Sequence, residues 1–174
     1  MKHIRFVIVA AFFLIFTGSN ECRAQDAFIW VPHGQESQHP GYTRVIGGKL
    51  NDGTPLPVCR AQINRIQTSG KYYNSRCLMP WHGSELSNNT TYDIFMTKAA
   101  FHWKPFHDLS RAQIESSAVL ADIGLKDTGH MYICRRQMQD GVHPGKFAIG
   151  YGFCYISWGG KEYHFTDGFD ILVR

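Results

Sequence analysis

The chain has 174 residues, with 18 Lys and Arg against 14 Asp and Glu and a formal net charge of +4. This length suits a domain that buries a substantial core, so we expect no metal ion to be needed for folding. The basic residues are scattered apart from the pair Arg135 and Arg136. That distribution excludes the concentrated positive surface of a nucleic-acid-binding protein.

Residues 1–24 have the layout of a secretory signal peptide. A basic start precedes an apolar run from Phe6 to Phe16, and small residues follow at positions 17–19 and 24. We expect cleavage after Ala24, with Ser19 as the second choice, and disfavour an uncleaved anchor because no stop-transfer pattern follows. Cleavage removes three basic residues and one acidic residue, which leaves a net charge of +2. We predict a secreted, extracellular protein, since no later stretch is apolar for long enough to span a membrane.

After the signal peptide, the sequence predicts short β-strands in chain order. The first half contains YTRVIGG, LPVCRAQI, SRCLMPW and TYDIFM, and the second half contains SAVLADIG, HMYICRRQM, KFAIGYGFCYISW and FDILVR. These runs are rich in β-branched or aromatic residues and are bounded by Gly, Asn, Asp or Pro. Residues 108–123 look helical in places, with Asp108 or Ser110 as a cap. We nevertheless expect strand and loop there, because the matching segment of the first half reads that way. The predicted fold is all-β, a sandwich or a barrel.

The two halves of the chain repeat each other. Arg60 and Arg135 lie 75 residues apart, and each is preceded by Asp at eight residues and followed by Lys at eleven. The next Cys follows 17 residues after Arg60 and 19 after Arg135, and a Glu lies eight residues beyond each Cys. The segment YDIF matches FDIL, and FIW matches FHW. We infer a tandem duplication, with repeat 1 over 25–98 and repeat 2 over 99–174, together forming one compact domain.

Four cysteines remain after signal-peptide cleavage, and they are Cys59, Cys77, Cys134 and Cys154. An even set in a secreted domain predicts disulfides rather than a catalytic thiol. We place the two cysteines of each repeat on neighbouring strands, joined by loops over 62–75 and 137–150. A bridge within each repeat is the preferred pairing, while pairing across the repeats is equally symmetric and stays open.

The pattern resembles the DM9 repeat, a module common in insects and molluscs and usually found as a tandem pair. The first copy carries Val-Ile-Gly-Gly, Asp-Gly, Val-Cys-Arg-Ala, Gly-Lys, Gly-x-Glu and Tyr-Asp-Ile. The second copy carries Ile-Cys-Arg-Arg, Pro-Gly-Lys, Gly-Gly-Lys-Glu and Phe-Asp-Ile-Leu. The resemblance covers essentially the whole mature chain. It implies a pseudo-twofold β fold, recognition of mannose-type sugars and a role in recognising microbes.

The resemblance also implies a sugar site made of a Lys from the Gly-Lys element and an acidic residue after the Gly-Gly pair. The Lys carries over as Lys71 and Lys146, but the acidic position holds Leu50 and Leu125. An Asp lies two residues after each Leu, and side chains two apart point to the same face of a strand. With the Glu of each Gly-x-Glu element, the candidate ligand-binding residues are Lys71, Lys146, Asp52, Asp127, Glu85 and Glu162.

Other polar and aromatic residues have structural interpretations beside functional ones. For Arg60 and Arg135 we favour ion pairs inside the fold, with a carboxylate such as Glu85 or Glu162 as the partner. Aromatic residues near the Gly-Lys and Gly-x-Glu elements either cover a sugar ring or fill the core. They are Tyr72, Tyr73, Trp81, Tyr151, Trp158 and Tyr163.

The segment NNTT contains two overlapping glycosylation sequons, at Asn88 and Asn89, and we expect one of them to be used. The chain has no nucleophile elbow, zinc-protease helix, phosphate loop or dinucleotide fingerprint, and its histidines fall singly.

We therefore predict a secreted, lectin-like protein that binds mannose-type or microbial glycans without catalysis, cofactor or metal and acts in innate immunity. The alternative is a non-catalytic interaction protein that keeps the fold, has lost sugar binding and recognises a protein partner. An enzyme such as a methyltransferase would need a Gly-rich strand-to-helix turn, which is missing from the sequence. We also consider a homodimer.

Overall fold

The computed structural model describes residues 27–122, 124 and 127–174. The predicted signal peptide and Leu125 lie outside these residues. The first half forms β1 (Phe28–Pro32), β2 (Thr43–Arg44), β3 (Ile46–Leu50), β4 (Pro55–Ile63), β5 (Ile66–Tyr73), β6 (Arg76–Trp81), β7 (Ser84–Asn88) and β8 (Asp93–Thr97). The second forms β9 (His102–Pro105), β10 (Leu120–Asp122), β11 (Met131–Met138), β12 (Gly141–Ala148), β13 (Phe153–Trp158), β14 (Lys161–Phe165) and β15 (Asp170–Val173). The helical segments are η3 (Glu36–Gln38), η4 (Phe106–Asp108) and α1 (Arg111–Ser117).

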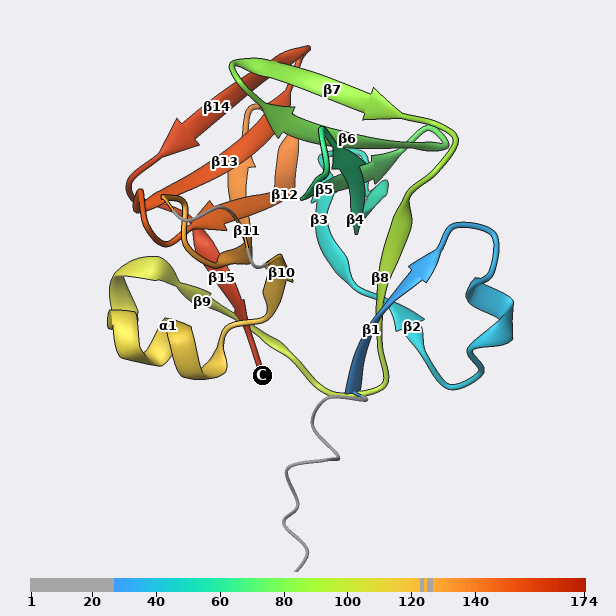
Figure 1. Ribbon diagram of the computed structural model, residues 1–174, viewed down its shortest axis with the longest axis horizontal. Coiled ribbons are helices and arrows are strands. Elements are labelled where there is room, and N and C mark those ends of the chain that lie inside the picture. The colour runs from blue at the N-terminus through green and yellow to red at the C-terminus, as the bar shows by residue number, and fades with distance from the viewer. Residues whose placement is uncertain (1–26, 123, 125–126) are drawn as a thin grey trace, which may run out of the picture.

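The fold is all-β, as predicted, and its strand order has twofold symmetry. The strands run β1-β8-β4-β5-β6-β7 and continue β14-β13-β12-β11-β15-β9, so each strand of one repeat on this path has a counterpart in the other. Figure 1 shows β7 and β14 side by side at one end of the molecule, where the two halves meet. The pair Ser84 and Lys161 lies at this junction, and the two residues occupy equivalent positions in their repeats.

Strand β3 closes the sheet into a ring of eight strands. It pairs with β4 on one side and with β12 of the other repeat on the other side. The approach to β12 is so close that a Cβ added at Gly48 would lie 1.8 Å from the carbonyl oxygen of Val142. Gly141, with φ +149°, faces the same constraint, because its added Cβ would lie 2.3 Å from the carbonyl oxygen of Lys49. The barrel therefore closes at glycine positions, where the lack of a side chain lets the two backbones approach each other.

Two strands occupy segments where we expected loops. Residues 62–75 contain β5 and residues 137–150 contain β12, so this prediction was wrong. The run GVHPGK has the Gly and Pro content of a turn, but β12 has strand partners on both edges, in β11 and β13, which hold it extended. Consequently the cysteines of each repeat lie on strands that flank a middle strand, and not on neighbouring strands.

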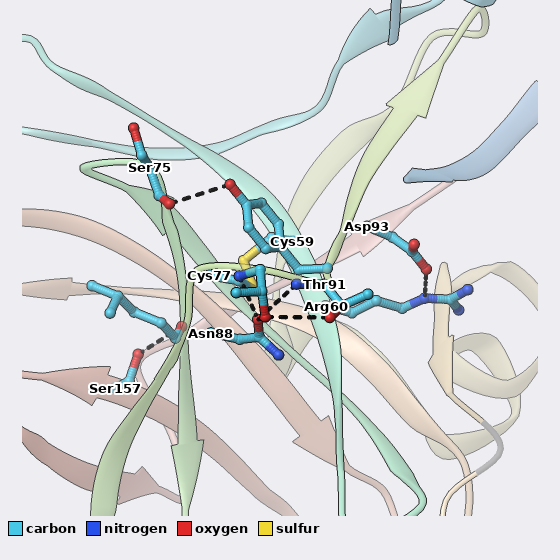
Figure 2. The surroundings of a disulfide bond; sticks show 11 residues. Cys59, Arg60, Ser75, Cys77, Asn88, Thr91, Asp93 and Ser157 are labelled. Carbon is cyan, nitrogen blue, oxygen red and sulfur yellow. Dashed lines mark hydrogen bonds and ion pairs between the residues drawn. A yellow bond between two sulfur atoms is a disulfide. The ribbon is translucent and has the colours of Figure 1, made fainter. Parts of the chain in front are cut away.

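The disulfides form within each repeat, as preferred. They join Cys59 to Cys77 and Cys134 to Cys154, with Cα–Cα distances of 5.8 and 6.2 Å. Figure 2 shows the first bridge between β4 and β6. Each is fully buried in the hydrophobic core of its own repeat. A third core joins the repeats, and its fully buried members include Val58, Ile133 and Leu172.

The helix α1 occupies Arg111–Ser117, where we expected strand or loop, while β10 lies in the predicted strand segment SAVLADIG. Ser110 begins it with a capping box, because its hydroxyl accepts from the Gln113 N–H and the Gln113 side chain accepts from the Ser110 N–H. Ile114 is the buried residue of the helix, and it packs in the core of the second repeat. Local capping and this one contact outweigh the strand propensity of the flanking residues. No helix among the described residues is long and apolar enough to cross a membrane.

Arg60 forms an internal ion pair, but its partner differs from the predicted Glu. Its Nε lies 2.9 Å from Asp93 Oδ2, because β4 and β8 pair with these two residues opposite each other. Its guanidinium lies 4.5 Å from the centre of the Trp30 ring. The second repeat has the same arrangement. Arg135 Nε lies 2.9 Å from Asp170 Oδ2, and the Arg135 guanidinium lies 4.4 Å from the centre of the Trp103 ring.

Candidate functional site

Two buried lysines lie at the junction between the repeats. Lys71 on β5 is 4 % exposed and Lys146 on β12 is 6 % exposed. The Lys71 ammonium donates to the carbonyl oxygen of Ser157, and the Lys146 ammonium donates to that of Pro80 at 2.7 Å. Ser157 and Pro80 occupy equivalent positions, so each repeat supplies a carbonyl acceptor to the lysine of the other.

Lys71 lies in a cleft of about 360 Å³ that both repeats line. Its ammonium is 3.0 Å from Glu85 Oε2 on β7, which brings two of the predicted site residues together. The second repeat contributes polar and aromatic groups from β12, from β13 and from the turn between β11 and β12. The lining residues are Leu50, Leu56, Lys71, Tyr73, Leu78, Glu85, Asp140, His143, Trp158 and Gly159.

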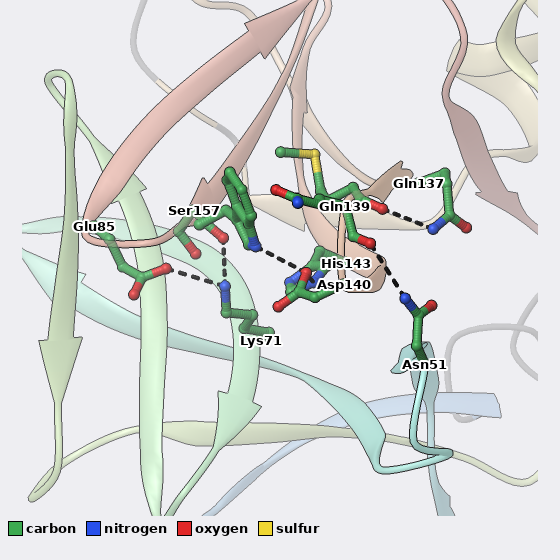
Figure 3. A network of polar contacts seen from close by, with 10 residues as sticks. Asn51, Lys71, Glu85, Gln137, Gln139, Asp140, His143 and Ser157 are labelled. Atoms are coloured by element: carbon green, nitrogen blue, oxygen red, sulfur yellow. Dashed lines mark hydrogen bonds and ion pairs between the residues drawn. The ribbon is translucent and has the colours of Figure 1, made fainter.

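Asp140 is held at the wall of this cleft by two donors. Its Oδ1 is 2.8 Å from both the His143 Nε2 and the Trp158 Nε1. The close view in Figure 3 places this group beside the Lys71, Glu85 and Ser157 contacts. The carboxylate is 52 % exposed, while the His143 side chain is 3 % exposed. The cleft therefore has a buried cationic end and a carboxylate that water reaches.

The electrostatics of the Lys71 cleft reflect this burial. Burial lowers the pKa of Lys71, and Glu85 and Asp140 oppose that effect by favouring the charged amine. Burial and the nearby Lys71 charge also lower the pKa of His143, against the pull of Asp140. The pKa of Asp140 is lowered, since hydrogen bonds from His143 and Trp158 outweigh its partial burial. Asp140 is consequently a carboxylate at neutral pH.

Lys146 lies in a second cleft, of about 210 Å³, at the equivalent place in the other half. Its ammonium is 5.0 Å from the centre of the Trp81 ring and 5.8 Å from that of Tyr155. The remaining walls are also largely aromatic or apolar. The lining residues are Ile66, Trp81, His82, Thr128, Met131, Lys146, Ala148, Tyr151, Tyr155 and Glu162.

The charges of the second cleft are arranged differently. Burial lowers the pKa of Lys146 to about 8, although the charge of Glu162 favours the protonated amine. Glu162 Oε2 accepts a hydrogen bond from the Gly83 N–H at 2.6 Å. Among the described residues, no direct ion pair joins Lys146 to Glu162, in contrast to Lys71 and Glu85. This cleft is therefore the less polar of the two.

The predicted acceptors Asp52 and Asp127 do not line either cleft. Asp52 lies in the exposed turn between β3 and β4, where its Oδ1 accepts from the Thr54 N–H at 2.8 Å. Asp127 is exposed in a turn next to Thr128, which does line the second cleft. Leu50 lies in the wall of the Lys71 cleft, at the place where the resemblance implies an acidic residue.

The two sequons differ in the accessibility of their asparagines. Asn88 Oδ1 accepts the N–H groups of Thr90 and Thr91, both at 3.0 Å, so this side chain shapes the loop before β8 (Figure 2). Asn89 is exposed. Use of either asparagine stays a prediction, and the structure favours Asn89 on accessibility.

The polar side chains of the Lys71 cleft that sequence reasoning missed come from the opposite repeat. Asp140 and His143 line the Lys71 cleft, but the counterparts of these positions are Arg65 and Thr68, so the duplication pattern does not single them out. Trp81 and Trp158 were recognised only as aromatic residues near the Gly-x-Glu elements. Across the described residues, no group of three or more His, Cys, Asp or Glu side chains is arranged to hold a metal ion.

A model of the DM9 repeat matches residues 70–165, which is more than half of the chain and includes both lysines. No curated protein has a significant sequence match to the chain. Among solved structures, the chain is similar to the crystal structure of the nematode sperm cell motility protein MFP2B. The TM-score is 0.59 and the identity 16 %, over 75 % of this chain and 41 % of that chain. This chain thus spans about two fifths of the length of that protein, and the likeness concerns the fold alone.

Proposed function

The chain belongs to the DM9 repeat family, and we propose that it is a secreted lectin-like protein that binds mannose-type glycans without catalysis. The observation that carries the proposal is the pair of clefts at the junction of the repeats. Each contains a buried Lys, a Glu from the Gly-x-Glu element and a Trp from the opposite repeat. Family membership supports the coarser statement, a recognition protein of the carbohydrate-binding type.

The chemistry of the clefts suits a sugar. Vicinal hydroxyls need fixed donors and acceptors, and an ammonium beside a carboxylate supplies both at short range. The lysines are already oriented by carbonyl acceptors, so little side-chain entropy is lost when a hydroxyl binds. An indole ring in each wall offers a flat apolar surface for the C–H face of a sugar.

Secretion and a role in recognising microbial surfaces complete the proposal. Two disulfides within the described chain suit an oxidising, extracellular compartment. Glycans rich in mannose on a microbial surface would be ligands of the stated class. No cofactor is invoked, and a homodimer stays a prediction.

The test is retention of the secreted, disulfide-bonded protein on immobilised mannose, with elution by free mannose. The double variant Lys71→Met/Lys146→Met should lose retention, because Met fills the same volume without a donor. Lys104→Met is the matched control, since Lys104 is exposed on β9 and lines neither cleft. The control should be retained like the wild type.

A folded wild-type protein that passes through the column would contradict sugar binding. The second candidate, an interaction protein that recognises another protein, would then be favoured. One specific observation supports it, namely Leu50, an apolar side chain in the Lys71 cleft where the resemblance implies an acidic one.

A further inference from the structure

We propose that Asp140, a residue of the second repeat, is the sugar-hydroxyl acceptor of the Lys71 cleft and makes that cleft the principal glycan site of the chain. This inference rests on the proposed function. It adds Asp140 as a binding residue and a difference in affinity between the Lys71 and Lys146 clefts. The two clefts share their lysine, Glu and Trp, but only the Lys71 cleft contains a second carboxylate, which two donors fix and water reaches.

The carboxylate of Asp140 is preorganised to accept hydrogen bonds. Both the His143 Nε2 and the Trp158 Nε1 lie 2.8 Å from Oδ1, so the side chain is held without using its other oxygen. Oδ2 has no hydrogen bond to any described residue, and the side chain is half exposed at the cleft wall. A fixed acceptor with a free oxygen is the arrangement that a hydroxyl pair needs. The Asp140 side chain is already ordered before the sugar binds, so binding loses little of its conformational entropy.

The backbone places Asp140 beside the position that Leu50 occupies. The Asn51 N–H donates to the carbonyl oxygen of Asp140 at 2.8 Å, and Gly141 is the strand partner of Leu50. Leu50 and Asp140 also line the same cleft as Lys71. The acidic group that the resemblance implies at position 50 therefore has a substitute that arrives from the other repeat through the pairing of β3 with β12.

The Lys146 cleft lacks an equivalent group. The counterpart of Asp140 in the repeat register is Arg65, which is exposed and does not line that cleft. The one carboxylate in the lining of the Lys146 cleft is Glu162, and among the described residues a single donor, the Gly83 N–H, holds its Oε2 at 2.6 Å. The lining of this cleft has Trp81, Tyr151 and Tyr155 and no second carboxylate. The two clefts thus differ in acceptor groups, and one sugar per chain is the expected stoichiometry at moderate concentration.

The experiment is a titration of the full secreted protein with methyl α-mannoside. Calorimetry measures the affinity and stoichiometry, and the NMR signals of the tryptophan indoles show which cleft is occupied. Trp158 reports the Lys71 cleft and Trp81 reports the Lys146 cleft. We expect a stoichiometry near one and a shift of the Trp158 indole first. Asp140→Asn keeps an oxygen for His143 and Trp158 but removes the charge, and should weaken binding about tenfold or more.

Asp52→Asn is the matched control, because Asp52 is a neighbouring exposed carboxylate that does not line the cleft. Glu162→Gln alters the Lys146 cleft and should weaken binding less than Asp140→Asn does, and an equal or larger loss would overturn the ranking of the two clefts. Wild-type binding with an unchanged affinity in Asp140→Asn, or with the Trp81 indole shifting first, overturns the assignment of Asp140 and leaves the proposed function intact. Absence of binding in the folded wild type contradicts the proposed function itself.

Discussion

Lys146 has a charged amine in surroundings that disfavour the charge. It is 6 % exposed, and burial lowers its pKa to about 8, against an ordinary value of 10.5. Its charge is supported by the Pro80 carbonyl oxygen and by the ring of Trp81. A Met of similar length would fill the space without this desolvation cost. A buried Lys that weakens the fold is expected where the amine itself is needed for binding.

This burial predicts how stability depends on pH. Between pH 8 and 10.5 the unfolded chain keeps the Lys146 proton and the folded chain loses it, so the stability of the wild type rises with pH. The full difference corresponds to about 3 kcal/mol. Urea unfolding from pH 7 to 10 should therefore show the free energy of unfolding of the wild type rising relative to that of Lys146→Met. The same series with Lys104→Met is the control, and a pH-independent difference for Lys146→Met would contradict the prediction.

At the scale of elements, the same ion pair and ring stack fasten the outer strands of each repeat. Arg60 on β4 contacts Asp93 on β8 and Trp30 on β1, so one side chain links three consecutive strands of the sheet. The ion pair is only partly exposed, with 23 % and 26 % of the two side chains reaching water. The ring contact and the partial burial should make this ion pair contribute more to the free energy of unfolding than an ion pair on an open surface.

Replacing either arginine should therefore cost measurable stability. We expect Arg60→Met and Arg135→Met each to lower the free energy of unfolding by about 1–2 kcal/mol, from the lost ring contact and the unpaired Asp. Arg111→Met is the control, because its ion pair with Glu115 is exposed on α1 and should be worth less than about 0.5 kcal/mol. Equal losses in denaturant unfolding of all three variants would rule out the linking role.

For the whole molecule, the closure of the barrel depends on one crossing between the repeats. Strand β3 inserts between β4 and β12, and this pairing also brings Asp140 next to Leu50. Because Gly48 lies against the Val142 carbonyl oxygen, the crossing tolerates no side chain there. The fold and the composition of the Lys71 cleft thus have a common structural requirement.

Gly48→Ala should consequently be far more damaging than an ordinary Gly substitution. The added Cβ would lie 1.8 Å from backbone that cannot move without opening the ring, and we expect a loss of at least about 3 kcal/mol. Gly53→Ala is the comparison, because Gly53 has φ +89° but open space around it. Its cost should be about 1–2 kcal/mol of backbone strain. Similar unfolding midpoints for the two variants would show that the crossing is dispensable.

Residue types and spacings along the chain predicted the all-β class, the duplication and a preference for disulfides within each repeat, and the resemblance to the DM9 repeat singled out Lys71 and Lys146. Each of these depends on residue types and spacings that are visible along the chain. The tertiary structure decided which side chains meet. Asp93 rather than Glu85 pairs with Arg60, and Asp140 reaches the Lys71 cleft, because strand pairing brings distant residues opposite each other. Contacts between strands that lie tens of residues apart depend on the register of the closed sheet, and a local pattern does not contain that register.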